Sequence, residues 1–432
     1  MTEASHHIDA VHRTETDASG LLLAADGTPL KKKLRQALKI SRRRAFLLVA
    51  PLLLFIMASF VIPIMMLLIQ GVKDDTFSSI MPDTSAVLSE WDASGEPSEA
   101  MAAALVSDLI AARKIDRSLP TKVGTRVNRE VSGAISLFKK TTRRAPKMEA
   151  PFLDALYATD KKWKNIEYWK AMKIASQTIT PAYYAAAVDK KYLADGSFID
   201  QPEDRQIYVQ LFVKTILVAG GVMVACILLG FPVAYLLADL PARQANLLMI
   251  LVLLPFWTSL LVRTTAWIAM LQSAGVLNDI FVWIGITTDD QRFSLIYNMT
   301  GTIIAMTHIL LPFMILPIYS VMKAIPPSHV RAAKSLGATN WTAFWRVYFP
   351  ATIPGIGAGG LLVFILAIGY YITPALVGGQ DGQLISNFIA YHMQKSLNWS
   401  LAAALGGILL ALILVLYWLY DRIVGIDNMK LG

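Results

Sequence analysis

The side chains best suited to bind a solute lie inside long apolar segments of this sequence. Arg263, beside Thr264 and Thr265, has Trp257 and Trp267 about one to two helical turns away. An ionisable side chain in such a segment is costly unless it faces a cavity or a polar partner. Two interpretations are therefore open for Arg263: a structural arginine that pairs with backbone carbonyls or reaches the segment's end, or a residue that lines a solute path.

Two further polar groups occur in apolar segments. His308 is either a packed histidine with its hydrogen bonds satisfied or a residue that faces solute. Tyr370, Tyr371 and Thr373 precede Pro374, which is expected to break a helix. A broken helix at membrane depth is tolerated only where it is buried in protein or lines water, so this cluster either contacts solute or packs inside the protein.

The sequence contains no constellation of residues that is typical of an enzyme active site. It has no Gly-Lys dipeptide, so the phosphate-binding loop G-x-x-x-x-G-K-[ST] is absent and ATP cannot bind by that route. Cys226 is the only cysteine, which excludes disulfides within the chain and a cysteine metal site. His6 and His7 lack metal-ligand spacing. We therefore expect no cofactor and no metal on this chain, and any energy for transport must come from elsewhere.

The composition is that of a membrane protein. Hydrophobic residues make up 55% of the chain and charged residues 16%, and the mean hydropathy is +0.49. Apolar runs reach the roughly 20 residues that cross a bilayer. The sequence therefore predicts an all-α membrane protein with six spans: 45–70, 209–238, 247–270, 295–321, 355–376 and 401–424.

Basic residues at the span ends predict the orientation. With a cytoplasmic N-terminus, fifteen Lys and Arg residues flank the cytoplasmic ends and two, Arg292 and Lys395, lie in the short loops opposite. Both termini are then cytoplasmic, and the formal net charge of +9 needs no nucleic-acid partner. Residues 1–44 form a basic N-terminal segment whose polar first part we expect to be disordered. The first span, 45–70, is too long for a signal peptide, and no cleavage site follows it.

An insertion at residues 71–205 separates the first two spans and is far more charged than the rest. Its segments 98–115 and 127–142 carry apolar residues at helical spacing, which predicts short amphipathic helices in a small domain on the external side. Three roles stay open for it: a cap on a complex, a contact for a delivery partner, or a structural element.

The segment 331–356, between the fourth and fifth spans, reads as helix, turn and helix. Ser328 is a candidate N-cap for the first helix, and Gly337 suits the left-handed position that ends it. Thr339 is a candidate N-cap for the second helix, which we expect to end at Pro350. The second helix carries large aromatic residues on one face, which is typical of a docking surface: Trp341, Phe344, Trp345 and Tyr348.

This segment resembles the cytoplasmic signature loop of the inner-membrane permeases of binding-protein-dependent ABC importers, E-A-A-x3-G-x9-I-x-L-P. Ala332, Ala333, Gly337 and Pro350 keep its spacing, and Arg331 stands where Glu is usual. The resemblance implies a coupling loop, residues 324–354, that inserts into a separate ATPase dimer, which binds ATP and Mg. The residues that the resemblance assigns to coupling are Arg331, Ala332, Ala333, Gly337, Ala338, Trp341 and Phe344.

Four more segments are similar to the spermidine/putrescine-type permease group: 253–271, 275–278, 306–322 and 369–379. The resemblance covers about residues 209–424 and implies a permease core at 206–428 in a bacterial inner membrane. It also implies a second, related permease subunit and a periplasmic solute-binding protein. The substrate-path candidates are then Trp257, Arg263, Trp267, His308, Tyr370, Tyr371 and Thr373.

The charge distribution leaves the solute open. A polyamine needs carboxylates, yet no Asp or Glu lies in the middle of a predicted span. Aromatic faces can hold ammonium groups, and a partner permease can supply the acids. Arg263 instead suits a carboxylate-bearing, amino-acid-like or opine-like solute. A self-sufficient secondary carrier is a further hypothesis, but no internal repeat is evident and the docking loop has no role in a carrier.

Overall fold

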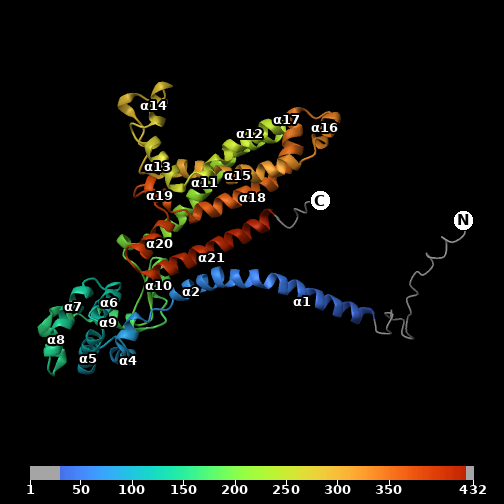
Figure 1. Cartoon of the computed structure of the whole chain (residues 1–432). Coiled ribbons are helices and arrows are strands. Elements are labelled where there is room, and N and C mark those ends of the chain that lie inside the picture. Colours follow the sequence, from blue (N-terminus) through green and yellow to red (C-terminus); the bar gives the residue numbers. More distant parts are fainter. Residues whose placement is uncertain (1–29, 425–432) are drawn as a thin grey trace. The chain divides into compact units, whose positions relative to one another are not determined.

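The computed structural model describes residues 30–424, which are mostly helical (Figure 1). The predicted disordered segment before residue 30, His6, His7 and Lys430 lie outside the described residues. Six helices are long and apolar enough to cross a membrane: Ala37–Gln70, Tyr208–Asp239, Leu260–Trp283, Met299–Ala324, Asn340–Gly369 and Trp399–Arg422. The predicted all-α membrane fold is confirmed. The chain divides into two compact units at Leu67 and Leu68.

The first unit contains one long helix. It comprises α1 (Leu30–Ile56), a π-helical turn at Met57–Val61 and the start of α2 (Ile62–Gln70). Pro63 follows the wide turn and has no N–H to donate back along the helix. The turn absorbs this defect, since the Ile62 N–H bonds five residues back to the Met57 carbonyl. The span therefore continues through the proline.

Three long helices of the second unit pack side by side (Figure 1): α11 (Tyr208–Asp239), α15 (Met299–Ala324) and α18 (Phe349–Gly369). Small residues allow α18 to approach α15 closely. A Cβ on Gly359 would lie 3.1 Å from the Met314 carbonyl oxygen, and one on Gly355 would lie 3.0 Å from that of Pro317. These two glycines therefore permit close packing of the helices.

The third span differs from the prediction. The range 247–270 is not one helix but α12 (Ala242–Leu253), a 3-10 turn at Leu254–Trp257, an extended pair, and α13 (Leu260–Leu271). Pro255 weakens the helix, and the Ser259 hydroxyl starts α13 by accepting a 3.1 Å bond from the Val262 N–H. The candidate span is therefore Leu260–Trp283, which includes α14 (Val276–Trp283).

The fifth span is broken near the predicted proline, but it ends earlier than the predicted Leu376. Helix α18 ends at Gly369, and α19 (Ile372–Val377) begins after Tyr370 and Tyr371. In a continuous helix the Pro374 ring would clash with the Tyr370 carbonyl, which explains the place of the break. Helices α20 (Ile385–Gln394) and α21 (Trp399–Val424) complete the membrane part.

The insertion is helical, as predicted, and has its own hydrophobic core. Trp163 and Trp169 are fully buried at its centre, with ring centroids 5.4 Å apart. A short hairpin, which was not predicted, pairs β1 (Lys190–Tyr192) with β2 (Phe198–Asp200). Its helices are α3 (Thr76–Ile80), α4 (Pro82–Glu90), α5 (Glu99–Ile115), α6 (Leu119–Asn128), α7 (Ala134–Arg144), α8 (Phe152–Thr159), α9 (Ile166–Ser176) and α10 (Ala182–Ala187), with 3-10 turns at Ala145–Lys147, Lys161–Lys164 and Glu203–Arg205.

A buried ion network ties the insertion together where it joins the membrane helices. Arg126 Nε lies 2.8 Å from Asp74 Oδ2, and both side chains are almost fully buried. Arg129 lies 3.4 Å from the same carboxylate, and its Nη2 donates to the Leu397 carbonyl just before α21. The Tyr183 hydroxyl of α10 donates to Asp74. The network thus connects the chain after α2 with α6, α10 and the start of α21.

Asp189 fixes the other connection, from the insertion into α11. Its carboxylate accepts hydrogen bonds from three backbone N–H groups at the start of α11: Ile207 at 3.1 Å, Tyr208 at 2.9 Å and Val209 at 2.8 Å. A carboxylate at a helix N-terminus satisfies unpaired donors and complements the helix dipole.

Candidate functional site

Helices α13 and α15 bring two of the candidate residues into contact. Trp267 Nε1 donates a 3.1 Å hydrogen bond to His308 Nδ1, and the two rings meet edge to face with centroids 5.2 Å apart. His308 lies in mid-helix and is exposed at the surface of the chain. This polar pair therefore occupies an open face of the permease part rather than its packed interior.

Thr373 joins α19 to α13. Its hydroxyl lies 3.3 Å from that of Thr264, and both side chains are fully buried. The Thr264 hydroxyl already donates to the Leu260 carbonyl at 2.9 Å, so Thr373 is the donor between the two. This contact holds the two broken helices together.

Arg263 lies in the first turns of α13, which begins at Leu260 after the break in the predicted span 247–270. Its side chain is half-buried, and it forms no ion pair within residues 30–424. Its guanidinium carries a positive charge and lies near the positive end of the α13 dipole.

Two polar residues that sequence reasoning missed stabilise the break beside Tyr371. Asn387 Nδ2 donates to the Tyr371 carbonyl at 2.8 Å, and the Ser386 hydroxyl donates to the Ile368 carbonyl at 2.7 Å. Both lie in the first turn of α20, and unpaired carbonyls at membrane depth cost several kcal/mol each, about 2–7 kcal/mol. The only signal in the sequence is a polar pair at the start of the apolar stretch 385–394.

Trp257 is not part of this cluster. It ends the 3-10 turn before α13 and is 74% exposed. Tyr370 and Tyr371 lie at the break itself, and Tyr371 is 38% exposed. The structure thus brings Trp267 of α13 against His308 of α15, with Arg263 one turn before Trp267 on α13 and with Tyr370 and Tyr371 at the break after α18.

The segment between α15 and α18 folds as helix, turn and helix. Helix α16 (Pro327–Ser335) ends in a turn in which Gly337 has φ 93°, the left-handed conformation predicted for it. The predicted cap at Thr339 is confirmed, since its hydroxyl accepts from the Thr342 N–H at 3.2 Å and starts α17 (Asn340–Ala343).

Two details of that segment were wrong. Ser328 does not cap α16, because the helix begins at Pro327 and Pro326 occupies the cap position without a side-chain hydrogen bond. The second helix does not end at Pro350. A π-helical turn at Phe344–Tyr348 lets it run on into α18, much as the turn before Pro63 does in the first unit.

The aromatic residues of this segment pack on one another in a continuous series, because Trp345 contacts both Trp341 and Phe344, but their exposure differs. Phe344 and Tyr348 pack edge to face on Tyr235 of α11, with centroids at 6.0 and 5.5 Å. Trp341 and Trp345 form a pair at 5.5 Å and are 72% and 44% exposed. Phe344 and Tyr348 anchor the segment, and Trp341 and Trp345 are free to meet a partner.

The other candidate coupling residues lie around the exposed turn. Arg331 and Ala332 are exposed on α16, whereas Ala333 and Ala338 are half-buried. A cavity of about 770 Å³ lies between this segment and the ends of α11 and α15. The residues that line it include Asp239, Lys323, Arg331, Lys334, Phe344 and Tyr348.

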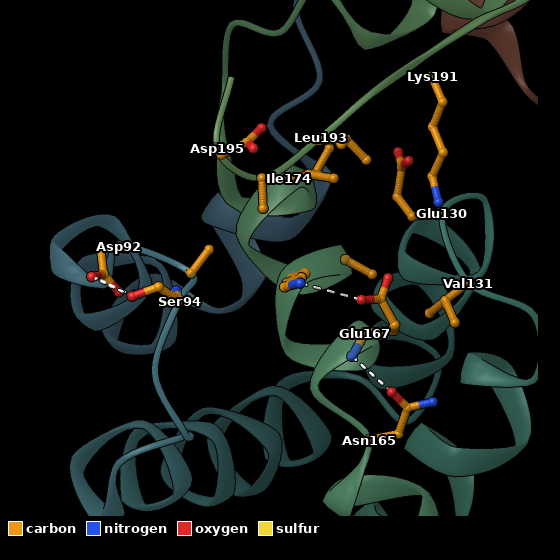
Figure 2. A pocket seen from close by; sticks show the side chains of 14 residues that line it. Asp92, Ser94, Glu130, Val131, Asn165, Glu167, Ile174, Lys191, Leu193 and Asp195 are labelled. Atoms are coloured by element: carbon orange, nitrogen blue, oxygen red, sulfur yellow. Dashed lines mark hydrogen bonds and ion pairs between the residues drawn. The ribbon is translucent and has the colours of Figure 1, made fainter. Parts of the chain in front are cut away.

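A second cavity, of about 490 Å³, lies in the insertion (Figure 2). Four carboxylates line it, and each is engaged by a neighbour. Glu130 pairs with Arg126 at 2.9 Å and Glu167 with Lys170 at 3.4 Å. Asp92 and Asp195 accept from serine hydroxyls two residues on, at 2.6 and 2.7 Å. These carboxylates form a hydrogen-bonded solvated face. In residues 30–424, no group of three His, Cys, Asp or Glu side chains could hold a metal ion.

Comparisons with known proteins concern the membrane part. The family model for the binding-protein-dependent transport system inner membrane component matches residues 227–424. The spermidine/putrescine transport system permease protein PotB of Escherichia coli (strain K12) is 34% identical over 220 residues, which are 50% of this chain and 79% of that protein. The protein of the same name from Haemophilus influenzae is 34% identical over 224 residues, 52% of this chain and 78% of that protein.

Solved structures include a bacterial alginate ABC transporter in complex with an alginate pentasaccharide-bound periplasmic protein. One of its chains is 19% identical, with a TM-score of 0.43, and the match covers 52% of this chain and 80% of that one.

Proposed function

We propose a function from one premise: this chain belongs to the family of binding-protein-dependent transport system inner membrane components, the permeases of ABC importers. In this proposal it passes a small charged solute, a polyamine such as spermidine or putrescine, from a periplasmic binding protein to the cytoplasm. The observation that carries the proposal is the 34% identity over 220 residues to the spermidine/putrescine permease PotB.

The residues around the broken helices form the solute path of this proposal. Trp267, Tyr370 and Tyr371 supply aromatic faces, and each ammonium group held over such a face gains about 2 kcal/mol when desolvated. The Trp267 bond to His308 supports this assignment, because it fixes both rings on an open face of the chain. The carboxylates that a polyamine needs come from a second, related permease subunit.

The loop at 324–354 couples ATP hydrolysis on a partner subunit to transport. The exposed Trp341 and Trp345 and the turn at Gly337 dock into a separate ATPase dimer, which binds ATP and Mg. Phe344 and Tyr348 link this loop to Tyr235 of α11, so a movement of the loop reaches the membrane helices through packed rings. This chain is then a transport subunit without catalytic activity of its own.

The topology follows from the basic residues at the span ends. Both termini are cytoplasmic, and the insertion at 71–205 lies outside, on the side of the binding protein. The network around Asp74 and Arg126 gives this domain a firm attachment to the start of α21.

A carboxylate-bearing solute is a second candidate, and Arg263 favours it. The guanidinium is half-buried, has no ion partner within the described residues and lies near the positive end of α13. A bidentate, charge-assisted pair with a solute carboxylate would satisfy it.

Native mass measurement of the complex, purified through a tag on this chain, tests the importer assignment. We expect one copy of this chain, one related permease and two ATPase subunits. A particle that holds only this chain and still transports solute without ATP would identify a secondary carrier instead.

A further inference from the structure

The exposed surface of the coupling loop is basic. No Asp or Glu occurs between Asp290 and Asp381, whereas Lys323 at the end of α15 and Arg331, Lys334 and Arg346 of the loop are basic. The Lys323 ammonium group donates to the Ala238 carbonyl at the end of α11, at 3.1 Å. The other three basic side chains are exposed and form no ion pair within residues 30–424.

These charges surround an apolar tip. Leu336 is 90% exposed and Trp341 is 72% exposed, and both lie close in sequence to Arg331 and Lys334. Among the described residues that line the adjoining cavity, Asp239 is the only carboxylate, and it forms no ion pair there with Arg331 or Lys334. An apolar centre with a charged rim is the usual anatomy of a protein interface.

A protein fits this surface better than a lipid headgroup. Helix α18 supplies 21 residues from Phe349 to Gly369, enough to cross the hydrocarbon. Trp341 lies eight residues before Phe349 in the same continuous helix, which places it about 12 Å further out at a rise of about 1.5 Å per residue. The tip at Leu336 lies beyond the capped start of that helix.

We propose that the ATPase groove that receives this loop is acidic, with carboxylates that pair with Arg331 and Lys334 around the apolar tip. This inference rests on the proposed function and adds the charge of the partner surface to it. Complementary charge raises the association rate and selects the partner, so the loop would reject an ATPase whose groove is basic.

The test measures binding of the cognate ATPase to the two permease subunits in neutral nanodiscs. Arg331→Glu and Lys334→Glu should each weaken binding about tenfold or more, and wild-type affinity should fall as salt rises. Arg243→Glu is the matched control, because Arg243 is exposed in the first turn of α12, where an acidic residue suits the helix dipole. It should bind as the wild type does.

Rescue separates charge pairing from misfolding. Each carboxylate along the ATPase groove would be replaced by Lys in turn. At least one of these ATPase variants should restore binding to the Arg331→Glu permease and should bind the wild-type permease more weakly. If Arg331→Glu and Lys334→Glu bind the ATPase with affinities within twofold of the wild type, the groove is not acidic. That result would not contradict the proposed importer function. If the wild type binds no ATPase, the proposed function itself fails. If the two variants lose affinity only for anionic vesicles, the surface is a lipid contact and the inference is wrong.

Discussion

The indole of Trp267 donates a hydrogen bond of 3.1 Å to Nδ1 of His308. In a neutral histidine that accepts at Nδ1, the other ring nitrogen carries the hydrogen and is a donor. His308 therefore presents an N–H group on the exposed face of α15. Two helices that are distant in sequence thus build one polar surface.

Removing the donor of this pair should weaken transport. Trp267→Phe keeps an aromatic ring but frees His308, and loss of one hydrogen bond of about 1 kcal/mol predicts a KM raised about fivefold. Kinetics of solute uptake check it. Trp257→Phe is the control, since Trp257 is exposed and lies outside the cluster. Equal KM values for the two variants would show that the pair does not shape the path.

The turn at Gly337 should be essential for coupling. Its φ of 93° excludes proline, whose ring fixes φ near −65°, although no neighbour would touch an added Cβ. Gly337→Pro should abolish uptake and stimulated ATP hydrolysis while the chain still inserts into the membrane. The control is Gly285→Pro, a turn with φ 77° and equally open space outside the loop. If Gly337→Pro couples normally, the loop is not the coupling element.

Labelling with an impermeant thiol reagent on intact cells should report the topology. Cys226 is the only cysteine and is buried, so Cys226→Ala provides the background. A cysteine at Lys147, exposed in the insertion, should react, and one at Asn340, exposed at the start of α17, should not. The opposite pattern would reverse the orientation.

The buried network should dominate the stability of the insertion. Arg126→Met removes the closest ion partner of Asp74, and breaking a buried pair costs about 3–5 kcal/mol. Lys190→Met, which removes an exposed partner of Asp200, should cost less than about 1 kcal/mol. Unfolding of the purified chain in denaturant gives both values. If Arg126→Met and Lys190→Met lowered the free energy of unfolding by similar amounts, Asp74 would be held by its hydrogen bonds alone.

The same network gives a pH dependence. Burial by itself would raise the pKa of Asp74, but the Arg126 charge and hydrogen bonds from Tyr183 and Thr76 outweigh it and lower that pKa. The carboxylate therefore adds stability above its ordinary pKa near 4, and this contribution disappears as the pH falls through the lowered value. The difference in stability between wild type and Arg126→Met should shrink below about pH 4.

Continuous apolar runs were easy to predict, and broken ones were not. The spans at Tyr208–Asp239 and Met299–Ala324 follow from length and hydropathy, because both helices stay continuous through the prolines that they contain. Hydropathy does not register the cap at Ser259, so the third span was predicted as one helix through a turn. Mean hydropathy over a window of residues does not change when one proline removes a backbone N–H group.

The contacts that build the site depend on residues distant in sequence. The pairing of Trp267 with His308 and of Thr264 with Thr373 could not be predicted, because no local pattern relates those positions. Gly337 and Thr339 were predictable, since a left-handed turn and an N-cap each have a local chemical signature. The π-helical turn before Pro350 has no such signature.

Solute identity is the central claim, and uptake tests it most directly. Proteoliposomes that contain this chain, its partner permease, the ATPase and the binding protein would be supplied with labelled spermidine or a labelled dicarboxylate, with and without ATP inside. Arg263→Gln, Tyr370→Leu and Tyr371→Leu would be measured beside the wild type.

We expect ATP-dependent spermidine uptake that Arg263→Gln leaves unchanged or improves and that the two Tyr→Leu variants reduce, because they keep bulk and lose the cation-binding ring. Uptake of the dicarboxylate alone, with a loss of about 2–5 kcal/mol in Arg263→Gln and normal behaviour of the Tyr→Leu variants, would contradict the polyamine assignment.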